Sequence, residues 1–573
     1  MESNKFTVYQ IFTRLYGNTR QARKPFGTIE ENGCGKFNAF TPSVLKQIRE
    51  KGITHVWYTG VIRHATVTDY SKYGIPTQHP AVVKGRAGSP YAITDYYDVD
   101  PDLAVNVPKR MEEFEKLVSR THRAGLKVII DFVPNHVARQ YKSICKPEGV
   151  RDLGEDDDNT QGFNPERNNF YYCPGQAFTP YFDLYHGEKE PYEEMPAKAT
   201  GNDCFNNAPG QNDWYETVKL NYGVDYYAGQ TPSSLSPLTT QHSLFSTWQK
   251  MTDILLFWAA KGIDGFRCDM AEMVPAAFWA YATQKVKEQY PDIIFIGEVY
   301  NPNEYRHYLA SGFDYLYDKV GMYDAMRDVI CHRRTADAIT WAWQQTDDIR
   351  QHMLYFLENH DEQRVCSDFF AGEGCSNSEG MLVSGASIGR KAVPALVVNA
   401  LLQSNPFMLY AGQEYGERGM DAEGFSGRDG RTTIFDYWSP VTLCRAAEGT
   451  LTEDEQQLSN LYNKVLNIAL KEKAVTEGLS FDLMYAQCGR YQRQYAFMRH
   501  HGKDTILVVA NFDDTPVDML LTIPAHAFDY MGITEKNYKA TDLLMGEKYS
   551  LTLQRDAQTL LHLEPRGSIV LKF

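Results

Sequence analysis

The sequence has no long apolar run and no excess of positive charge. No stretch of about 18 apolar residues occurs in its 573 residues, so we expect a soluble protein without a membrane span. Lys and Arg number 58 against 73 Asp and Glu, which gives a formal net charge of −15. Nucleic acids and anionic membranes select basic surfaces, so neither is an expected partner. A neutral polymer is compatible with this charge.

The sequence also shows no cysteine motif for metal binding and no recognisable leader peptide. The ten cysteines form no CxxC pair or zinc-like spacing, so no metal cluster is indicated. Cys173 with Cys204, or Cys366 with Cys375, could form a disulfide in an exported protein, but buried free thiols are the interpretation that we favour. The chain begins MESNKFTVYQIF and runs directly into a predicted strand, so we expect a cytoplasmic location. A periplasmic or extracellular protein whose leader had been removed would look the same.

No Gly-rich phosphate loop follows the first predicted strand, which argues against an open dinucleotide-binding sheet. Instead, short β-branched or aromatic runs alternate with amphipathic stretches such as PKRMEEFEKLVSRTHRAG. This alternation is typical of βα units around a parallel sheet, and eight strands suit a closed (β/α)8 TIM barrel. The predicted strands are residues 8–12, 55–59, 127–131, 265–269, 294–298, 313–317, 354–358 and 407–410.

Two stretches depart from the βα pattern. The interval after the third predicted strand is rich in Asn, Asp, Pro, Gly and Tyr and has little helical periodicity. It is too long for a simple connection, so we predict an inserted domain at residues 137–232. From about residue 476, alternating runs such as TILVVANF and GSIVLKF predict a C-terminal antiparallel β-sandwich, residues 476–573. The barrel would then comprise residues 1–136 and 233–475.

Polar residues gather where the predicted strands end. The third strand ends in DFVPNH, the fourth in GFRCD, the fifth in FIGE and the seventh in LENHD. Carboxylates at strand ends often cap the next helix, so each one alone has a structural explanation. The active site of a parallel barrel lies at the C-terminal ends of its strands, however. Four such endings therefore favour a catalytic site.

The carboxylates at neighbouring strand ends suit glycoside hydrolysis. Arg267 and Asp269 are two residues apart, so their side chains face the same way and Arg267 can hold Asp269 ionised for attack on an anomeric carbon. Glu298 lies one strand over. Retaining glycosidases need two carboxyls about 5–5.5 Å apart, and neighbouring strands lie about 4.8 Å apart, so this separation can be reached. Asp361 is a third carboxylate, which could raise the pKa of Glu298 and keep it protonated.

The motifs DFVPNH, GFRCD, FIGEV and ENHDE, in this order, resemble the four signature regions of glycoside hydrolase family 13, the α-amylase family. The resemblance covers the whole chain, including the insertion (domain B) and the terminal sandwich (domain C). It implies that Asp269 is the nucleophile, Glu298 the acid/base and Asp361 the transition-state stabiliser. In SPYAITDYYDVDP it implies that Tyr91 stacks on the sugar, and the alternative is a tyrosine that only fills the core. The residues implied to contact the sugar or brace the carboxylates are Tyr91, Asp131, His136, Arg267 and His360.

Two departures from the family pattern concern calcium. Many α-amylases follow the nucleophile with a Lys-His pair, where this chain has MAE. In TVKLNYG, Lys219 stands where the family often has Asp, and its ammonium could take the cation's place, since Lys cannot ligate calcium. Asn135 alone matches a usual calcium ligand. We therefore assign no metal residue, expect no required cofactor and consider calcium doubtful. The run GEDDDN, residues 154–159, could form a separate calcium loop, but a solvated turn is favoured.

These motifs predict an enzyme, a retaining α-glucan hydrolase that cleaves the α-1,4 bonds of starch, glycogen or maltooligosaccharides. A glucanotransferase or an exo-acting α-glucosidase would share the motifs. A catalytically inactive binding or scaffold subunit would lack the carboxylates and carry a membrane segment, and the sequence fits neither expectation. The loop after the eighth strand contains Phe425, Phe435, Tyr437 and Trp438. If they line a cleft, they favour binding of several sugar units and internal cutting.

Overall fold

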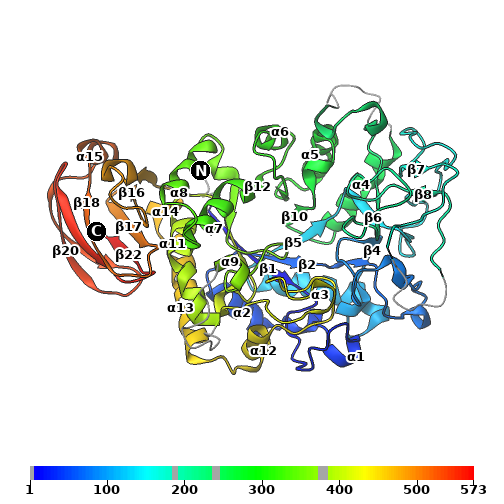
Figure 1. The fold of residues 1–573 in the computed structure, drawn as a ribbon, viewed down its shortest axis with the longest axis horizontal. Coiled ribbons are helices and arrows are strands. Elements are labelled where there is room, and N and C mark those ends of the chain that lie inside the picture. Colours follow the sequence, from blue (N-terminus) through cyan, green and yellow to red (C-terminus); the bar gives the residue numbers. More distant parts are fainter. Residues whose placement is uncertain (1–4, 183–190, 235–244, 372–384) are drawn as a thin grey trace.

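Eight parallel strands close into a barrel in the computed structural model, which describes residues 5–182, 191–234, 245–371 and 385–573 (Figure 1). The order around the barrel is β1-β14-β13-β12-β11-β10-β5-β2. The prediction of a closed TIM barrel is therefore confirmed. The barrel strands are β1 (Thr7–Phe12), β2 (His55–Thr59), β5 (Lys127–Phe132), β10 (Gly265–Cys268), β11 (Ile294–Gly297), β12 (Tyr315–Tyr317), β13 (Met353–Phe356) and β14 (Phe407–Tyr410).

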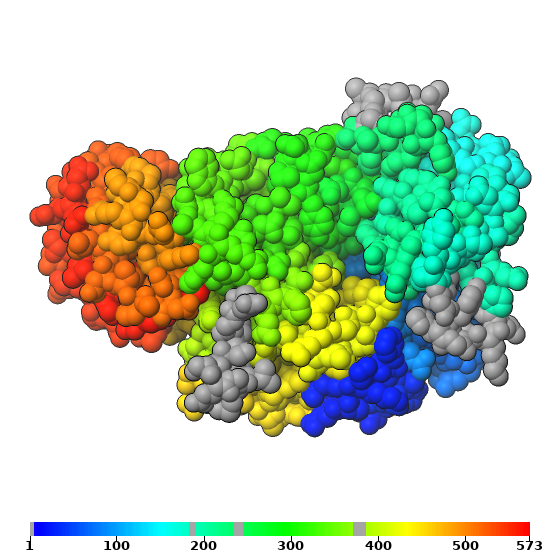
Figure 2. Space-filling model, in the orientation of Figure 1, coloured from blue at the N-terminus to red at the C-terminus, as the bar shows by residue number. Residues whose placement is uncertain are grey.

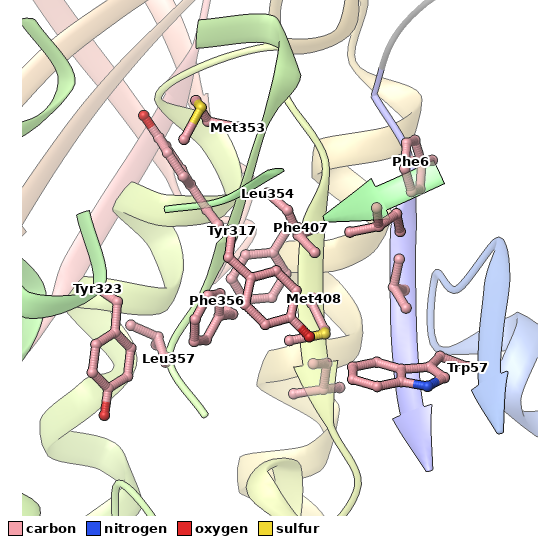
Figure 3. Packing of buried hydrophobic residues seen from close by; sticks show 14 of the residues in the cluster. Phe6, Trp57, Tyr317, Tyr323, Met353, Leu354, Phe356, Leu357, Phe407 and Met408 are labelled. Carbon is pink, nitrogen blue, oxygen red and sulfur yellow. The ribbon is translucent and has the colours of Figure 1, made fainter. Parts of the chain in front are cut away.

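The barrel strands are apolar because both of their faces are covered. Every residue of β1, β2 and β14 is buried, as expected for a parallel sheet with side chains filling its interior and helices outside it. Large side chains pack on both faces of these strands: Figure 3 shows Tyr317, Phe356, Phe407 and Met408 close together. The core cluster extends outward to helix residues such as Trp258.

The helices carry local signals at their ends. Helix α2 begins after Thr41, whose hydroxyl accepts a hydrogen bond from the Val44 amide, with Pro42 at its first position. Helix α13 begins at a capping box of Thr452 and Glu455. The α-helices are α1 (Ile29–Asn32), α2 (Pro42–Glu50), α3 (Arg110–Arg123), α4 (Ser246–Ala259), α5 (Ala276–Gln289), α6 (Tyr305–Ala310), α7 (Asp324–Ile330), α8 (Asp337–Gln345), α9 (Asp368–Ala371), α10 (Gly385–Gly389), α11 (Val393–Leu401), α12 (Val441–Glu448), α13 (Glu453–Lys471), α14 (Lys473–Thr476) and α15 (Ala525–Met531).

The long segment between β5 and α4 forms short antiparallel pairs instead of βα units. Strand β6 (His136–Ala138) pairs with β9 (Thr217–Lys219), and β7 (Tyr172–Cys173) pairs with β8 (Ala197–Lys198). The Tyr222 hydroxyl donates a 2.7 Å hydrogen bond to the carbonyl of Pro134 and so ties the end of the insert to the barrel. Another antiparallel pair, β3 (Ile62–His64) with β4 (Ile93–Val99), follows β2.

Antiparallel sheets follow the barrel, as the alternating C-terminal runs predict. One sheet has the order β15-β16-β17-β22-β19-β20, and β18 pairs with β21 in a second. These sheets and the insert lie at opposite ends of the molecule (Figures 1 and 2). The strands are β15 (Leu479–Asp482), β16 (Gln494–His501), β17 (Asp504–Asn511), β18 (Val517–Thr522), β19 (Lys536–Asp542), β20 (Lys548–Leu553), β21 (Gln558–Leu563) and β22 (Ser568–Lys572).

The cysteines that the structure describes are free thiols. Cys173 and Cys204 are both unpaired, so no disulfide joins them, and Cys366 is a buried thiol. Its proposed partner, Cys375, lies outside the described residues. Within the described ranges, no helix has both the length and the apolar character that crossing a membrane requires.

Candidate active site

The predicted pairing of Arg267 with Asp269 is present at the end of β10. The Asp269 amide donates to the carbonyl of Phe132 and continues the ladder to β5, which fixes the backbone one step past the strand. Arg267 Nη1 donates a 2.8 Å hydrogen bond to Asp269 Oδ1, and both side chains are buried. The other oxygen, Asp269 Oδ2, has no hydrogen-bond partner among the described residues. Arg267 therefore orients one carboxylate oxygen, and the other, also buried, is left without a hydrogen bond.

Glu298 lies beside this pair, at the end of β11. Its Oε1 is 2.7 Å from Arg267 Nη2, although that nitrogen makes no contact of hydrogen-bond geometry within the described part of the chain. Oε1 accepts a 2.6 Å hydrogen bond from the Tyr300 hydroxyl, and Oε2 accepts one of 2.8 Å from the Met270 amide. Both oxygens of the buried Glu298 carboxyl are thereby held in place.

Asp131 closes the cluster from β5. Its Oδ2 accepts hydrogen bonds from Trp57 Nε1 at 3.1 Å and the Gly60 amide at 3.2 Å, and its Oδ1 accepts one of 3.3 Å from the Tyr91 hydroxyl. Burial raises the pKa of Asp131 to about 6, and Arg267, 3.7 Å away, opposes this rise. The contacts agree with a bracing role, and they attach Tyr91 to the cluster.

His360 and Asp361 come from the loop after β13. The Gln10 amide nitrogen lies 2.7 Å from His360 Nδ1, while Nε2 faces the Tyr91 hydroxyl at 2.5 Å and Asp361 Oδ2 at 3.1 Å. An amide nitrogen donates, so Nδ1 accepts and the proton is on Nε2. Burial, and then Arg267, lower the pKa of His360 well below its usual value, so the ring is neutral. Gln10, His360, Tyr91 and Asp131 thus form one chain of donors and acceptors.

The buried Arg267 guanidinium lies within 4 Å of three carboxyls, those of Asp131, Asp269 and Glu298. Burial, together with Glu298, Asp361 and Asp131, raises the pKa of Asp269 well above its usual range, and Arg267 opposes the rise. Arg267 thus favours the ionised form of Asp269, as expected, while burial and the neighbouring carboxyls oppose it. A cluster with fewer cations than carboxyls favours the uptake of a proton. Arg267 hydrogen-bonds Asp269 and also lies 2.7 Å from Glu298, so one cation faces both carboxyls.

A pocket of about 240 Å³ opens onto these carboxyls. Of the eight residues singled out from the sequence, five line it: Tyr91, His136, Asp269, Glu298 and Asp361. The other three, Asp131, Arg267 and His360, do not line the pocket but contact the side chains that do. Arg267 and His360 are buried behind the lining residues, and their contact with the sugar stays a prediction.

His136 faces the insert. Its ring centroid is 5.2 Å from that of Trp214, and its Nδ1 lies 3.1 Å from the Asn135 amide nitrogen. Burial, followed by Lys219 and Lys84, lowers its pKa to about 3, so the ring is neutral. It therefore offers hydrogen bonds to a ligand without a charge of its own.

Sequence reasoning missed several site residues. Tyr300 follows Glu298 by two positions, so a search for polar residues two apart would have found it. A polar Gln10 within the apolar run VYQIF was a similar signal. Other residues come from segments with no catalytic motif. The missed residues that line the pocket include Lys84, Trp214, Glu216, Tyr300 and Ile434.

The aromatic residues of the loop after β14 separate into two groups. Phe435 lines the pocket, and Phe425 packs against its ring with centroids 5.0 Å apart. Tyr437 is buried and donates to Asp102 Oδ2 at 2.7 Å, and Trp438 is buried with Phe12 and Tyr410. The expectation that all four are available for stacking on sugar is therefore wrong for Tyr437 and Trp438, because both pack against the barrel.

Lys219 lies where the insert meets the barrel. Its ammonium donates to Asn135 Oδ1 at 2.5 Å, lies 2.6 Å from Asp203 Oδ1 and 3.4 Å from the carbonyl of Met273, and is buried. Three oxygens that could bind a cation already surround this ammonium group. The residues at this position therefore do not fit a calcium ion.

The acidic run at 154–159 is held by contacts within the chain. Asp157 accepts hydrogen bonds from the amides of Asn169 and Phe170, and Asp158 accepts from Thr160 and Gln161. Within the described ranges, the carboxylates with metal-like spacing are elsewhere, at Asp95 and Asp98 beside Cys145, and both pair with Arg63. These contacts agree with a solvated turn at 154–159.

Known proteins resemble this chain in sequence. The family model described as "Alpha amylase, catalytic domain" matches residues 10–465. Alpha-amylase 3 of Dictyoglomus thermophilum is 23% identical over 414 residues, which are 68% of this chain and 68% of that protein. A cyclomaltodextrinase of a Bacillus species is 23% identical over 524 residues, 88% of this chain and 72% of that protein. The match to Neopullulanase 2 of Thermoactinomyces vulgaris, 22% identical, covers 62% of this chain and 50% of that protein.

Solved structures share the fold. A maltogenic alpha-amylase, AmyB of Thermotoga neapolitana, superposes with a TM-score of 0.63 at 18% identity and covers all of this chain and 99% of its own. AmyP in complex with maltose gives a TM-score of 0.64 at 14% identity, covering all of this chain and 96% of its own. With the family match over most of the chain, these findings show that the chain belongs to the alpha-amylase family of glycoside hydrolases, glycoside hydrolase family 13.

Proposed function

We propose that this enzyme hydrolyses α-1,4-glucosidic bonds of maltooligosaccharides, starch or glycogen by double displacement, with retention of the anomeric configuration. The observation that supports this most directly is the arrangement around Arg267. Its guanidinium hydrogen-bonds Asp269 at 2.8 Å and lies 2.7 Å from a Glu298 carboxyl that both Tyr300 and the Met270 amide hold. Retaining glycoside hydrolysis uses two neighbouring carboxyls, one as the nucleophile and one as the proton donor.

In the first step, Asp269 Oδ2 attacks the anomeric carbon while Glu298 gives its proton to the departing glycosidic oxygen. A glycosyl ester on Asp269 results, and the shortened chain leaves. In the second step, Glu298 takes a proton from water, and the resulting hydroxide displaces Asp269 from the same carbon. Asp361, at the mouth of the pocket, stabilises the positive charge that develops on the sugar ring in both transition states.

The relatives support this chemistry by their names, which include an alpha-amylase, a cyclomaltodextrinase and a maltogenic alpha-amylase. Proton NMR of the first products from maltotetraose tests the proposal. We expect the α-anomer to appear first, with products shorter than the substrate. Initial β-anomer would contradict double displacement, and products longer than maltotetraose would identify sugar transfer instead of hydrolysis.

A further inference from the structure

The pocket has a wall built from segments outside the catalytic motifs. Lys84 precedes β4, Trp214 and Glu216 come from the insert, and Ile434 and Phe435 come from the loop after β14, yet all five line the same pocket. The pocket's volume of about 240 Å³ is below the about 300–1,000 Å³ of sites that enclose a drug-sized ligand. A space of this size suits one or two sugar rings.

An ion pair joins the insert to the segment that precedes β4. Lys84 Nζ lies 3.0 Å from Glu216 Oε2 and donates a 3.3 Å hydrogen bond to the carbonyl of Asp213. The same ammonium lies over the Tyr215 ring, 5.0 Å from its centroid. The side chains of Lys84 and Glu216 are only 10% and 5% exposed, so water screens this pair weakly. The contact therefore holds the insert against residue 84.

Backbone hydrogen bonds join the next residues to the loop after β14. The carbonyl of Phe435 accepts from the amides of Ala87 at 2.9 Å and Gly88 at 3.0 Å, and the Arg86 amide donates to Asp436 Oδ1 at 3.0 Å. Gly85 has φ +66°, and a Cβ atom there would lie 2.3 Å from the Phe435 carbonyl oxygen. The close approach of the two segments therefore depends on glycine at this position.

We infer that these contacts form a continuous wall, here called the 84–88 wall, from the insert through residues 84–88 to Phe435. The wall closes one side of the pocket and selects short maltooligosaccharides and chain ends over the interior of a long glucan. Internal cutting requires the chain to continue past the site in both directions, and the wall obstructs one of them. This inference rests on the proposed hydrolytic function, and it reverses the sequence-based expectation of internal cutting.

Wild-type specificity is the first test. We expect kcat/KM for maltotetraose to exceed that for soluble amylose, per susceptible bond, by about tenfold or more. Iodine staining of amylose should fall slowly relative to the reducing sugar released. Rapid loss of iodine staining with little reducing sugar would overturn the inference while leaving the hydrolytic function intact. Absence of hydrolysis, or initial β-anomer, would instead overturn the proposed function.

Variants of the ion pair test the wall itself. Lys84→Met and Glu216→Gln each remove one charge. Each should lower several-fold the ratio of kcat/KM for maltotetraose to kcat/KM for amylose. The swapped double variant, Lys84→Glu with Glu216→Lys, restores opposite charges and should recover part of the ratio. Lys261→Met, which breaks an ion pair with Glu115 on the outside of the barrel, is the matched control and should leave the ratio unchanged. An unchanged ratio in folded Lys84→Met and Glu216→Gln proteins would show that the wall does not select substrates.

Discussion

The side-chain amide of Gln10 lies 2.7 Å from Nδ1 of His360, although the two residues are 350 positions apart in the chain. Gln10 is on β1 and His360 follows β13, which β14 separates from β1 in the barrel. The amide accordingly places the proton of the neutral imidazole on Nε2, toward the Tyr91 hydroxyl and Asp361. Gln10 is thus a positioning residue for two side chains of the pocket.

Gln10→Glu should lower kcat by about tenfold or more while preserving the fold, because it keeps the shape and replaces a donor by an acceptor. The carboxylate would favour a proton on Nδ1 and raise the pKa of His360. The activity of the variant at low pH should therefore decline at a higher pH than that of the wild type. Steady-state rates measured against pH provide the check. A wild-type profile would mean that Gln10 only fills space.

Asp269→Asn should abolish turnover and lower kcat by about a thousandfold or more, because the near-isosteric amide cannot form the glycosyl ester. Thermal unfolding should change little, since the Arg267 contact can be kept by the amide oxygen. Asp253→Asn, at an exposed position on α4, is the control and should retain full activity. Residual activity within tenfold of the wild type, or instability equal to a core deletion, would disprove the nucleophile assignment.

We propose that calcium is not essential where the insert meets the barrel, since the Lys219 ammonium supplies the positive charge there. EDTA should leave both the melting temperature and the activity unchanged. Lys219→Met should lower the free energy of unfolding by about 1–3 kcal/mol, because it leaves Asn135 and Asp203 without their partner. This loss is smaller than for a fully buried ion pair, because the Asp203 side chain is 35% exposed and water screens its charge. Loss of tens of degrees of thermal stability on chelation would refute this proposal.

Acid should destabilise the fold below pH 6.5 through His55, among other groups. Burial, and then Lys127, lower the pKa of His55 from its ordinary 6.5 to about 3, so the folded protein keeps the ring neutral. Below pH 6.5 the unfolded chain binds a proton there that the folded chain does not. The stability due to His55 is therefore complete above pH 6.5 and falls toward pH 3, by at most about 1.4 kcal/mol per pH unit.

Denaturant unfolding of the wild type and of His55→Gln between pH 4 and pH 8 measures this effect. The variant is expected to be less stable at neutral pH, because the ring packs on Phe6 and bonds Thr54, but its stability should fall less steeply with acid. Parallel curves for the two proteins would show that His55 is not the titrating group.

The strand pattern and the motif order could be predicted because both depend on local chemistry. A parallel strand buried on both faces must be apolar along its length, and the polar residues of GFRCD, FIGE and LENHD mark where burial ends. Side-chain alternation then placed Arg267 beside Asp269 without a structure. The residue limits of the inserted and C-terminal domains stay a prediction.

What the sequence by itself determined is the barrel and its set of carboxyls, because strand alternation and strand ends fix them within a few residues. The tertiary structure alone decided which side chains reach the pocket. Lys84, Glu216 and Phe435 meet there only because three connections fold over the same barrel end, and Tyr437 and Trp438, in the same loop as Phe435, turn into the core instead. The direction of a loop depends on contacts with distant segments, such as the approach of Gly85 to Phe435, and no local pattern records those contacts.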